Sequence, residues 1–274
     1  MSKNKVFIHP TATVHPKASL DSGTWIGPYS FIGEKVIVGK NTKLDAHVCI
    51  AGLTDIGESC RFSAFSSVGT EPQDIGYKGE ETLVKIGAGN TFREFVTINR
   101  GTVKGGGKTV IGNDNYFMAY SHVGHDSCVG NETIFINAAT LAGHVTVHDF
   151  AQVGAFSAVH QFCRVGKYAF IGGYSVITQD VLPFCRVAGA RPVHIYGLNA
   201  IGLRRRGFDR KRLKDLRDMF RIIFLSELNT SQALEKIEKE MPSGEDKNEI
   251  IRFIQASERG IVKKTGERWE EESE

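Results

Sequence analysis

Apolar residues recur at every sixth position along most of this chain. The period is unbroken from Ile8 to Val68, returns in phase at Ile86, and after a one-residue shift runs from Ile111 to Ile177. A period of six matches neither the 3.6-residue turn of a helix nor the alternation of a long strand. All 26 positions are apolar, although such residues make up only 41% of the chain: Ile8, Val14, Leu20, Ile26, Ile32, Val38, Leu44, Ile50, Ile56, Phe62, Val68, Ile86, Phe92, Ile98, Ile111, Phe117, Val123, Val129, Phe135, Leu141, Val147, Val153, Val159, Val165, Ile171 and Ile177. The pattern therefore predicts a solenoid built from short repeated units.

The residues around each apolar position repeat as well. A glycine often follows directly, as at Gly27, Gly39 and Gly124, and a small residue such as Thr24 or Ser127 usually stands four residues after it. A short strand followed by a turn fits this unit, and glycine tolerates the positive φ that a tight turn requires. Stacking such units would bury the apolar column.

This repeat resembles that of the hexapeptide-repeat acyltransferases. In that family three hexads form one triangular coil of a left-handed parallel β-helix. The handedness follows from the resemblance alone, because ordinary parallel crossovers are right-handed. We therefore expect a mainly β protein, a left-handed parallel β-helix over residues 1–190 with a C-terminal α-helical domain over residues 191–274.

Two segments interrupt the repeat, at residues 70–85 and 99–110, and are expected to leave the coil as loops. Loops on a rigid scaffold are common places for binding groups.

The helical pattern begins after the period ends near Val181. Asp209 is expected to cap a helix that runs through Leu225, and Ser231 a second helix that ends near Met241. A third helix is expected at residues 245–259, followed by an acidic tail, GERWEEESE.

Charge and cysteine content narrow the function. The chain has 34 Lys and Arg against 31 Asp and Glu, a net charge of +3, so we expect no nucleic-acid partner. No apolar run approaches the length of a membrane span. The five cysteines are odd in number and form no CxxC pair. Reduced thiols in a cytoplasmic protein are the simplest interpretation, with neither a cofactor nor a metal site predicted.

Two basic or glycine-rich motifs have alternative interpretations. GGGKT, Gly105–Thr109, resembles a phosphate-binding loop, but Thr102 stands where that loop needs glycine and no helix follows, which favours a flexible glycine loop. A basic run begins at Arg204–Arg206 and continues to Arg221. It is either a solvated helix face or a docking surface for an acidic partner or a nucleotide diphosphate.

The stretch SHVGHDSCVG, residues 121–130, carries the sharpest candidate chemistry. Positions 18 residues apart stack in successive coils about 4.8 Å apart, so His125, Gly143 and Gln161 share one column. A base with an accessible backbone N–H one coil above it is the arrangement that acyl transfer requires. Asp126 stacks beneath His144, and reaches His125 only if the pair lies at a corner, because adjacent strand residues face opposite ways.

A zinc site is the alternative. A γ-type carbonic anhydrase has a similar β-helix and binds zinc through three histidines. His122, His125, His144 and His160 are the residues that could supply such ligands here.

Several longer motifs make the resemblance more specific. NRGTVKGGGKT, SHVGHDSCVGN, NAATLAGHV, VHQF and GLNAIGLRRRGF together resemble the family of acyl carrier protein-dependent UDP-N-acetylglucosamine O-acyltransferases, which begin lipid A synthesis. The resemblance covers residues 1 to about 225. It implies transfer of a 3-hydroxyacyl chain from acyl carrier protein to the glucosamine 3-position of UDP-N-acetylglucosamine, within a homotrimer whose sites lie between subunits.

The resemblance also implies residue roles. His125 would be the general base, Asp126 would orient its ring, and the Gly143 N–H would hold the oxyanion. Gly173 would leave room for an acyl chain of about fourteen carbons or longer. The implied substrate contacts are Gln73, Asp74, His122 and Gln161 for the sugar nucleotide, His144 near the pantetheine arm, and Asn199, Arg205 and Arg206 of a neighbouring chain for the diphosphate and ribose.

Three positions depart from the family pattern. Gly76 stands where better-known members carry a lysine, with Lys78 two residues on. Ile201 replaces a glutamate, and Asn99 replaces a histidine. These positions bear on the acceptor, so transfer to a 3-amino sugar, as in some relatives, stays open beside the 3-hydroxyl.

Overall fold

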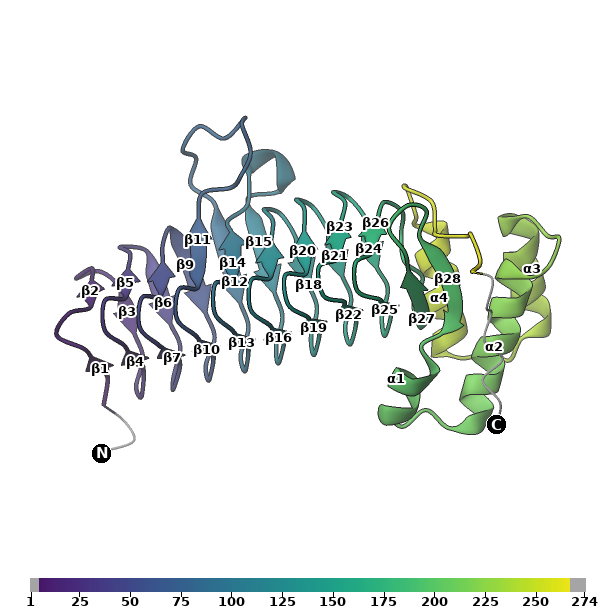
Figure 1. Ribbon diagram of the computed structural model, residues 1–274, viewed down its shortest axis with the longest axis horizontal. Helices are drawn as coiled ribbons and strands as arrows, with labels where there is room; N and C mark the ends of the chain where they lie inside the picture. Colours follow the sequence, from purple (N-terminus) through teal and green to yellow (C-terminus); the bar gives the residue numbers. More distant parts are fainter. Residues whose placement is uncertain (1–4, 267–274) are drawn as a thin grey trace.

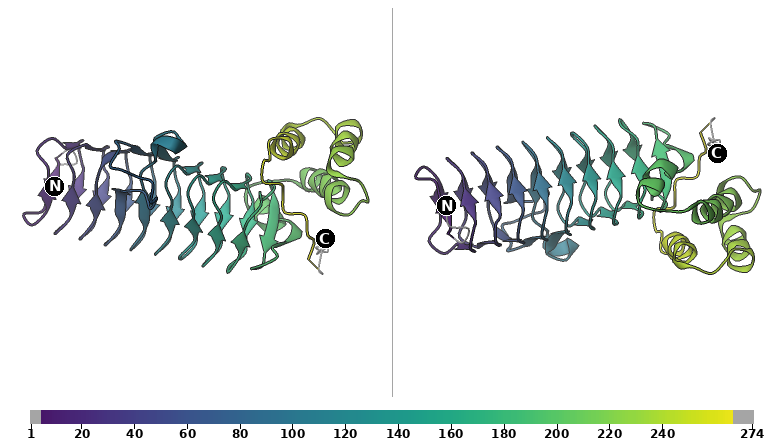
Figure 2. Two further views of the ribbon diagram at one scale, coloured as in Figure 1. Left: turned by 90° about the horizontal axis from the view of Figure 1, so that it is seen from above. Right: turned by 90° about the horizontal axis from the view of Figure 1, so that it is seen from below.

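The computed structural model describes residues 5–266 and shows a long coil of short strands with helices at its C-terminal end (Figures 1 and 2). From β1 to β26, strands three places apart in the chain pair in parallel, so the strands form three sheets that run the length of the coil, and β27 and β28 add an antiparallel pair to the first. The fold is the predicted left-handed parallel β-helix with a C-terminal helical domain.

The strands fall into three sheets, named here in the order in which the chain first enters them. The first sheet contains β1 (Phe7–Ile8), β4 (Trp25–Ile26), β7 (Lys43–Leu44), β10 (Arg61–Phe62), β13 (Thr91–Phe92), β16 (Tyr116–Phe117), β19 (Ile134–Phe135), β22 (Gln152–Val153), β25 (Phe170–Ile171), β27 (Cys185–Ala188) and β28 (His194–Leu198). The second contains β2 (Thr13–Val14), β5 (Phe31–Ile32), β8 (Cys49–Ile50), β11 (Ser67–Thr70), β14 (Thr97–Asn99), β17 (His122–Val123), β20 (Thr140–Leu141), β23 (Ala158–Val159) and β26 (Val176–Ile177). The third contains β3 (Ser19–Leu20), β6 (Val36–Val38), β9 (Leu53–Ile56), β12 (Leu83–Ile86), β15 (Lys108–Ile111), β18 (Cys128–Val129), β21 (Thr146–Val147) and β24 (Arg164–Val165).

The hexad residues form the core of the coil. Each strand from β1 to β26 carries one of them, and from Ile26 onward all are at most 2% exposed. Ile8 is 44% exposed, and Val14 and Leu20 are only half-buried, because they lie in the first coil, with a neighbour on one side. The prediction of an apolar column is therefore confirmed.

The predicted reason for the glycines is wrong at most positions. Non-glycine residues take the positive φ at the corners, three residues after the apolar position, as Asp126 does with φ 60° and His144 with φ 62°. The glycine beside the apolar residue lies instead where the next coil comes very close. A Cβ on Gly39 or Gly124 would lie 2.6 or 2.7 Å from a backbone carbon of the coil above. Close approach of the backbone, rather than turn conformation, requires glycine there.

Two longer connections leave the coil on the same side (Figure 1). One spans residues 71–82, between β11 and β12, and the other spans residues 100–107, between β14 and β15. The second contains a 3-10 turn, Val103–Gly105, with Thr102 as its N-cap. The shorter connection therefore contains a regular turn and is not an irregular loop.

Four helices follow the coil: α1 (Ala200–Arg205), α2 (Arg210–Phe224), α3 (Thr230–Glu240) and α4 (Glu245–Gln255). Asp209 caps α2 as predicted, but the predicted cap Ser231 is wrong, since Asn229 caps α3 through a capping box with Gln232. The last helix, α4, ends at Gln255, before the predicted residue 259, because Ser257 leaves it to bond Asp180 of the coil.

The boundary between the two parts stays a prediction. Strand β28 pairs with β27 beyond residue 190, so the first sheet continues into the second predicted domain. The acidic tail lies outside the described residues, apart from its first glycine. No helix in residues 5–266 is long and apolar enough to cross a membrane.

Candidate active site

His125 and Asp126 lie at the corner between β17 and β18. Asp126 adopts φ 60°, a left-handed conformation that aspartate tolerates better than most residues. This conformation turns its carboxylate back toward the preceding imidazole, so His125 Nδ1 and Asp126 Oδ2 are 2.7 Å apart. The corner therefore solves the problem that adjacent residues of a flat strand face opposite ways.

Asp126 is held on several sides by the protein. Its carboxylate has no exposed surface and accepts hydrogen bonds from the Thr102 N–H at 2.8 Å and the Thr102 hydroxyl at 2.7 Å. Its own N–H donates to Thr109 Oγ1 at 2.9 Å. The sequence interpretation missed both threonines, although each lies in or beside the second interruption of the hexad pattern.

Gly143 lies directly against the His125 ring, as the spacing of 18 residues predicts. A Cβ on Gly143 would lie 2.6 Å from Cε1 and 2.7 Å from Nε2 of that ring. Within residues 5–266, no backbone carbonyl accepts the Gly143 N–H. The glycine thus allows the imidazole and a free backbone donor to share one small space.

His144 completes a cluster around the same carboxylate. Its Nε2 is 3.7 Å from Asp126 Oδ2, and its ring meets that of His125 edge-on at 5.2 Å. Phe162, one coil further on, stacks on His144 with ring centroids 4.5 Å apart and is half-exposed. Phe162 is a third residue that the sequence interpretation missed.

These groups also satisfy the donor set of a small metal site. Ligand atoms of His125, Asp126 and His144 lie within 4.8 Å of one another. However, both Asp126 oxygens already accept hydrogen bonds, and Oδ2 is also bonded to His125 Nδ1. The geometry favours an oriented base over a three-ligand metal centre.

His122 lies near His125 but faces a different partner. Its Nδ1 is 2.7 Å from Thr97 Oγ1. Burial, and to a smaller degree the neighbouring His125, lower the pKa of His122 below its usual value. It is therefore neutral near pH 7 and suited to hydrogen bonding rather than to carrying charge.

The structure does not bring the remaining predicted residues into contact with His125 within one chain. Gln73 and Gln161 are exposed, the first in the 71–82 connection and the second in the coil above Gly143. Asp74 accepts the Gly76 N–H at 2.8 Å and so shapes its own loop. Gly76 stands where better-known members of the family carry a lysine. Lys78, two residues further on, is exposed, and its N–H donates to Glu80.

The three residues assigned to a nucleotide lie at or within α1. Asn199 caps this helix and donates to the Tyr168 carbonyl at 3.0 Å. Arg206 pairs with Glu132 and lies over the Phe150 ring, whereas Arg205 is exposed. They lie beyond the contacts of His125 in this chain.

Gly173 is exposed and has space above it. A Cβ there would find only the Ala155 carbonyl oxygen, at 3.3 Å, and the Ala155 nitrogen, at 3.9 Å. A larger side chain at this position would therefore project outward.

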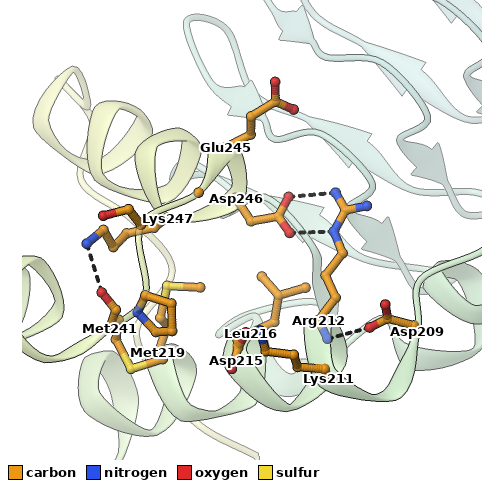
Figure 3. Close-up of a pocket in the computed structure, with 13 residues that line it drawn as sticks. Asp209, Lys211, Arg212, Asp215, Leu216, Met219, Met241, Glu245, Asp246 and Lys247 are labelled. Carbon is orange, nitrogen blue, oxygen red and sulfur yellow. Dashed lines mark hydrogen bonds and ion pairs between the residues drawn. The ribbon is translucent and has the colours of Figure 1, made fainter.

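The basic run divides between structural and exposed roles. Arg212 forms a paired interaction with the Asp246 carboxylate, which joins α2 to α4 beside a pocket of about 390 Å³ (Figure 3). Lys247 of that pocket donates to the Met241 carbonyl at 2.9 Å and so caps the end of α3 (Figure 3). Arg210, Lys211 and Lys214 remain exposed on α2.

The comparisons with known proteins agree with the geometry of the site. Residues 180–262 match the family model described as domain 2 of UDP N-acetylglucosamine O-acyltransferase. A protein from Thermodesulfovibrio yellowstonii, named acyl-[acyl-carrier-protein]–UDP-N-acetylglucosamine O-acyltransferase, is 48% identical over 93% of this chain and 99% of its own.

Solved structures agree with this similarity. LpxA from Acinetobacter baumannii is 41% identical, with a TM-score of 0.91 over 94% of this chain and 100% of that chain. A UDP-N-acetylglucosamine acyltransferase from Bacteroides fragilis is 39% identical, with a TM-score of 0.91 and the same coverage of 94% and 100%.

Proposed function

Because this chain belongs to the family of UDP-N-acetylglucosamine O-acyltransferases, we propose that it transfers a 3-hydroxyacyl chain from acyl carrier protein to the glucosamine 3-position of UDP-N-acetylglucosamine. This reaction is the first step of lipid A synthesis. The observation that carries the proposal is the His125–Asp126 pair directly against Gly143. The names of the relatives, all O-acyltransferases, favour a hydroxyl over an amine as the acceptor.

His125 is the general base. Its Nδ1–H donates to Asp126, which leaves the lone pair on Nε2, and a Cβ on Gly143 would lie 2.7 Å from this nitrogen. Nε2 takes the proton from the sugar 3-hydroxyl as the oxygen attacks the thioester carbonyl. The buried Asp126 carboxylate stabilises the imidazolium that forms, without itself accepting the proton.

Gly143 stabilises the tetrahedral intermediate. Its N–H donates to the oxyanion that develops on the former thioester carbonyl. When the intermediate collapses, the carbon–sulfur bond breaks and the imidazolium returns the proton to the departing thiolate. The products are the 3-O-acyl sugar nucleotide and the free thiol of the carrier.

The residues assigned to the nucleotide do not contact His125 within one chain. A neighbouring chain would bring them to the site, so we propose a homotrimer. Asn199, Arg205 and Arg206 would reach the nucleotide from an adjacent subunit. A row of stacked rings at the corner between the first and second sheets supports assembly, because successive rings lie 4.8–5.1 Å apart and those of Tyr29, Phe65, Phe95 and Tyr120 are 41–63% exposed. Exposed aromatic surface of this kind is typical of protein interfaces.

A reducing compartment suits the thiols. The five cysteines Cys49, Cys60, Cys128, Cys163 and Cys185 are all unpaired. Together with a cytoplasmic carrier protein as donor, this supports action in the cytoplasm.

A direct assay tests the function. Radiolabelled UDP-N-acetylglucosamine is incubated with carrier proteins that bear 3-hydroxyacyl chains of different length. The wild-type protein should transfer the chain, and His125→Ala should lose roughly two to four orders of magnitude in rate with its fold intact. Absence of transfer with every chain length would rule the function out.

Subunit mixing tests the shared site. His125→Ala and Arg205→Ala are each expected to be nearly inactive. In mixed trimers about one quarter of the interfaces pair two intact halves, so activity should return on refolding the two together. If a mass measurement shows that mixed trimers have formed and activity still does not return, the whole site lies in one chain.

A further inference from the structure

The proposed mechanism leaves the connection at residues 100–107 without a role, although it contains the first part of the GGGKT stretch. We propose that Thr102 and Gly105 of this connection are positioning residues that fix the Asp126 carboxylate in the orientation that holds His125. This inference rests on the proposed function, since it concerns the same base.

Thr102 binds both oxygens of the carboxylate. Its N–H donates to Oδ1 at 2.8 Å and its hydroxyl donates to Oδ2 at 2.7 Å. Oδ2 is also the atom that accepts from His125 Nδ1. A carboxylate held at both oxygens has no freedom to rotate about its last bond, so the direction of the His125 hydrogen bond is fixed by Thr102.

Gly105 covers the face of the same carboxylate. A Cβ on this residue would lie 2.0 Å from the Asp126 Cγ and 2.3 Å from each of its oxygens. Gly105 does not have a positive φ, so its backbone conformation is open to any residue. Only the close approach to Asp126 requires glycine here.

The two following glycines serve a different purpose. Gly106 and Gly107 adopt φ of 92° and 77°, and a Cβ on either would meet nothing within 4 Å. They make the turn, whereas Gly105 shapes the site. The GGGKT stretch is therefore neither a phosphate loop nor a uniform flexible segment.

The connection behaves as one unit with Asp126. Thr102 Oγ1 also accepts the Gly105 N–H at 3.2 Å, and the Thr102 carbonyl accepts the Gly107 N–H at 2.8 Å. The turn thus closes around Thr102 before it returns to β15, where Thr109 accepts the Asp126 N–H. Together, these contacts satisfy both carboxylate oxygens and the backbone N–H of Asp126 with hydrogen bonds.

A double-mutant cycle tests the inference. Thr102→Val removes one hydrogen bond to a charged group, a loss that corresponds to a kcat about 10- to 100-fold lower, with KM for both substrates unchanged. Thr102→Ser retains the hydroxyl and should restore kcat to within about threefold of wild type. In an Asp126→Ala background, both Thr102→Val and Gly105→Ala should cost less than about twofold, because the group through which they act is gone.

Val103→Ala is the matched control. Val103 lies in the same turn and is 63% exposed, so its truncation should leave kcat unchanged. Gly105→Ala changes a half-buried residue whose backbone conformation suits alanine, and it should fold even if Thr102→Val does not, which keeps the test available. Equal losses in the wild-type and Asp126→Ala backgrounds would overturn the inference. Absence of acyl transfer by the wild-type protein would instead refute the function itself.

Discussion

Gly143→Ala tests whether the site depends on the close approach of His125 to the coil above. The added Cβ would lie 2.6 Å from Cε1 and 2.7 Å from Nε2 of the imidazole. Ordinary contacts between such atoms are about 3.5–4.0 Å, so the ring must retreat by about 1 Å. Gly143 has no positive φ, so alanine suits the backbone and the N–H donor is kept.

The expected loss follows from that displacement. The His125 side chain is 15% exposed, so the ring can move toward solvent. This movement stretches its 2.7 Å hydrogen bond to Asp126. A misplacement of about 1 Å costs roughly 100-fold in rate, or about 2.7 kcal/mol in transition-state free energy. We expect kcat to fall by about that factor while the melting temperature stays near that of the wild type.

Initial rates at saturating concentrations of both substrates measure this effect. Gly33→Ala is the control, because a Cβ there lies in ordinary contact, 3.5 Å from the nearest atoms of Ala51 and Ile50. If Gly143→Ala keeps more than about a third of the wild-type kcat, the packing of His125 against Gly143 does not determine its catalytic position.

Four further changes have defined outcomes. Asp126→Asn should lower kcat by two orders of magnitude or more, because the amide favours the wrong tautomer of His125, and an unchanged kcat would remove Asp126 from the mechanism. Gly173→Met should shift the preference of the acyl transfer assay toward shorter chains, since its side chain would project from an exposed position, and an unaltered preference would contradict this. Burial lowers the pKa of His148, so the unfolded chain binds more protons than the folded one below about pH 6.5 and the free energy of unfolding falls there; urea titrations of His148→Gln should show a weaker fall between pH 7 and 5, and equal slopes would exclude this contribution. Dialysis against EDTA should leave the rate unchanged, whereas stoichiometric zinc together with loss of activity would support a metal centre at His125, Asp126 and His144.

The coil and the central pair could be predicted because both repeat. The hexad gives each strand, and the distance of 18 residues gives the stacking of His125 beneath Gly143. Thr102 could not be placed in this way, because its segment leaves the repeat and its position depends on one turn that folds back. The sequence does not distinguish Gly105 from its two neighbours, although only Gly105 approaches Asp126.

Other differences arise from contacts between distant parts of the chain. Helix α4 ends early because Ser257 bonds Asp180, about 80 residues away in sequence. Asn199 was expected to bind a nucleotide, and in one chain it caps a helix. Its expected role depends on a second chain. The hydrophobic periodicity of one sequence does not show which residues of two chains come together.

The unequal ends of the coil bear on the order in which the protein folds. Within residues 5–266, β1 has a neighbouring strand on one side only, and its two residues, Phe7 and Ile8, remain exposed, whereas helices and β28 close the other end. The coil that contains β1 is therefore the one least able to persist alone. Folding is expected to begin among the later coils, where Phe92, Phe117 and Phe135 stack, and to spread back toward the N-terminus.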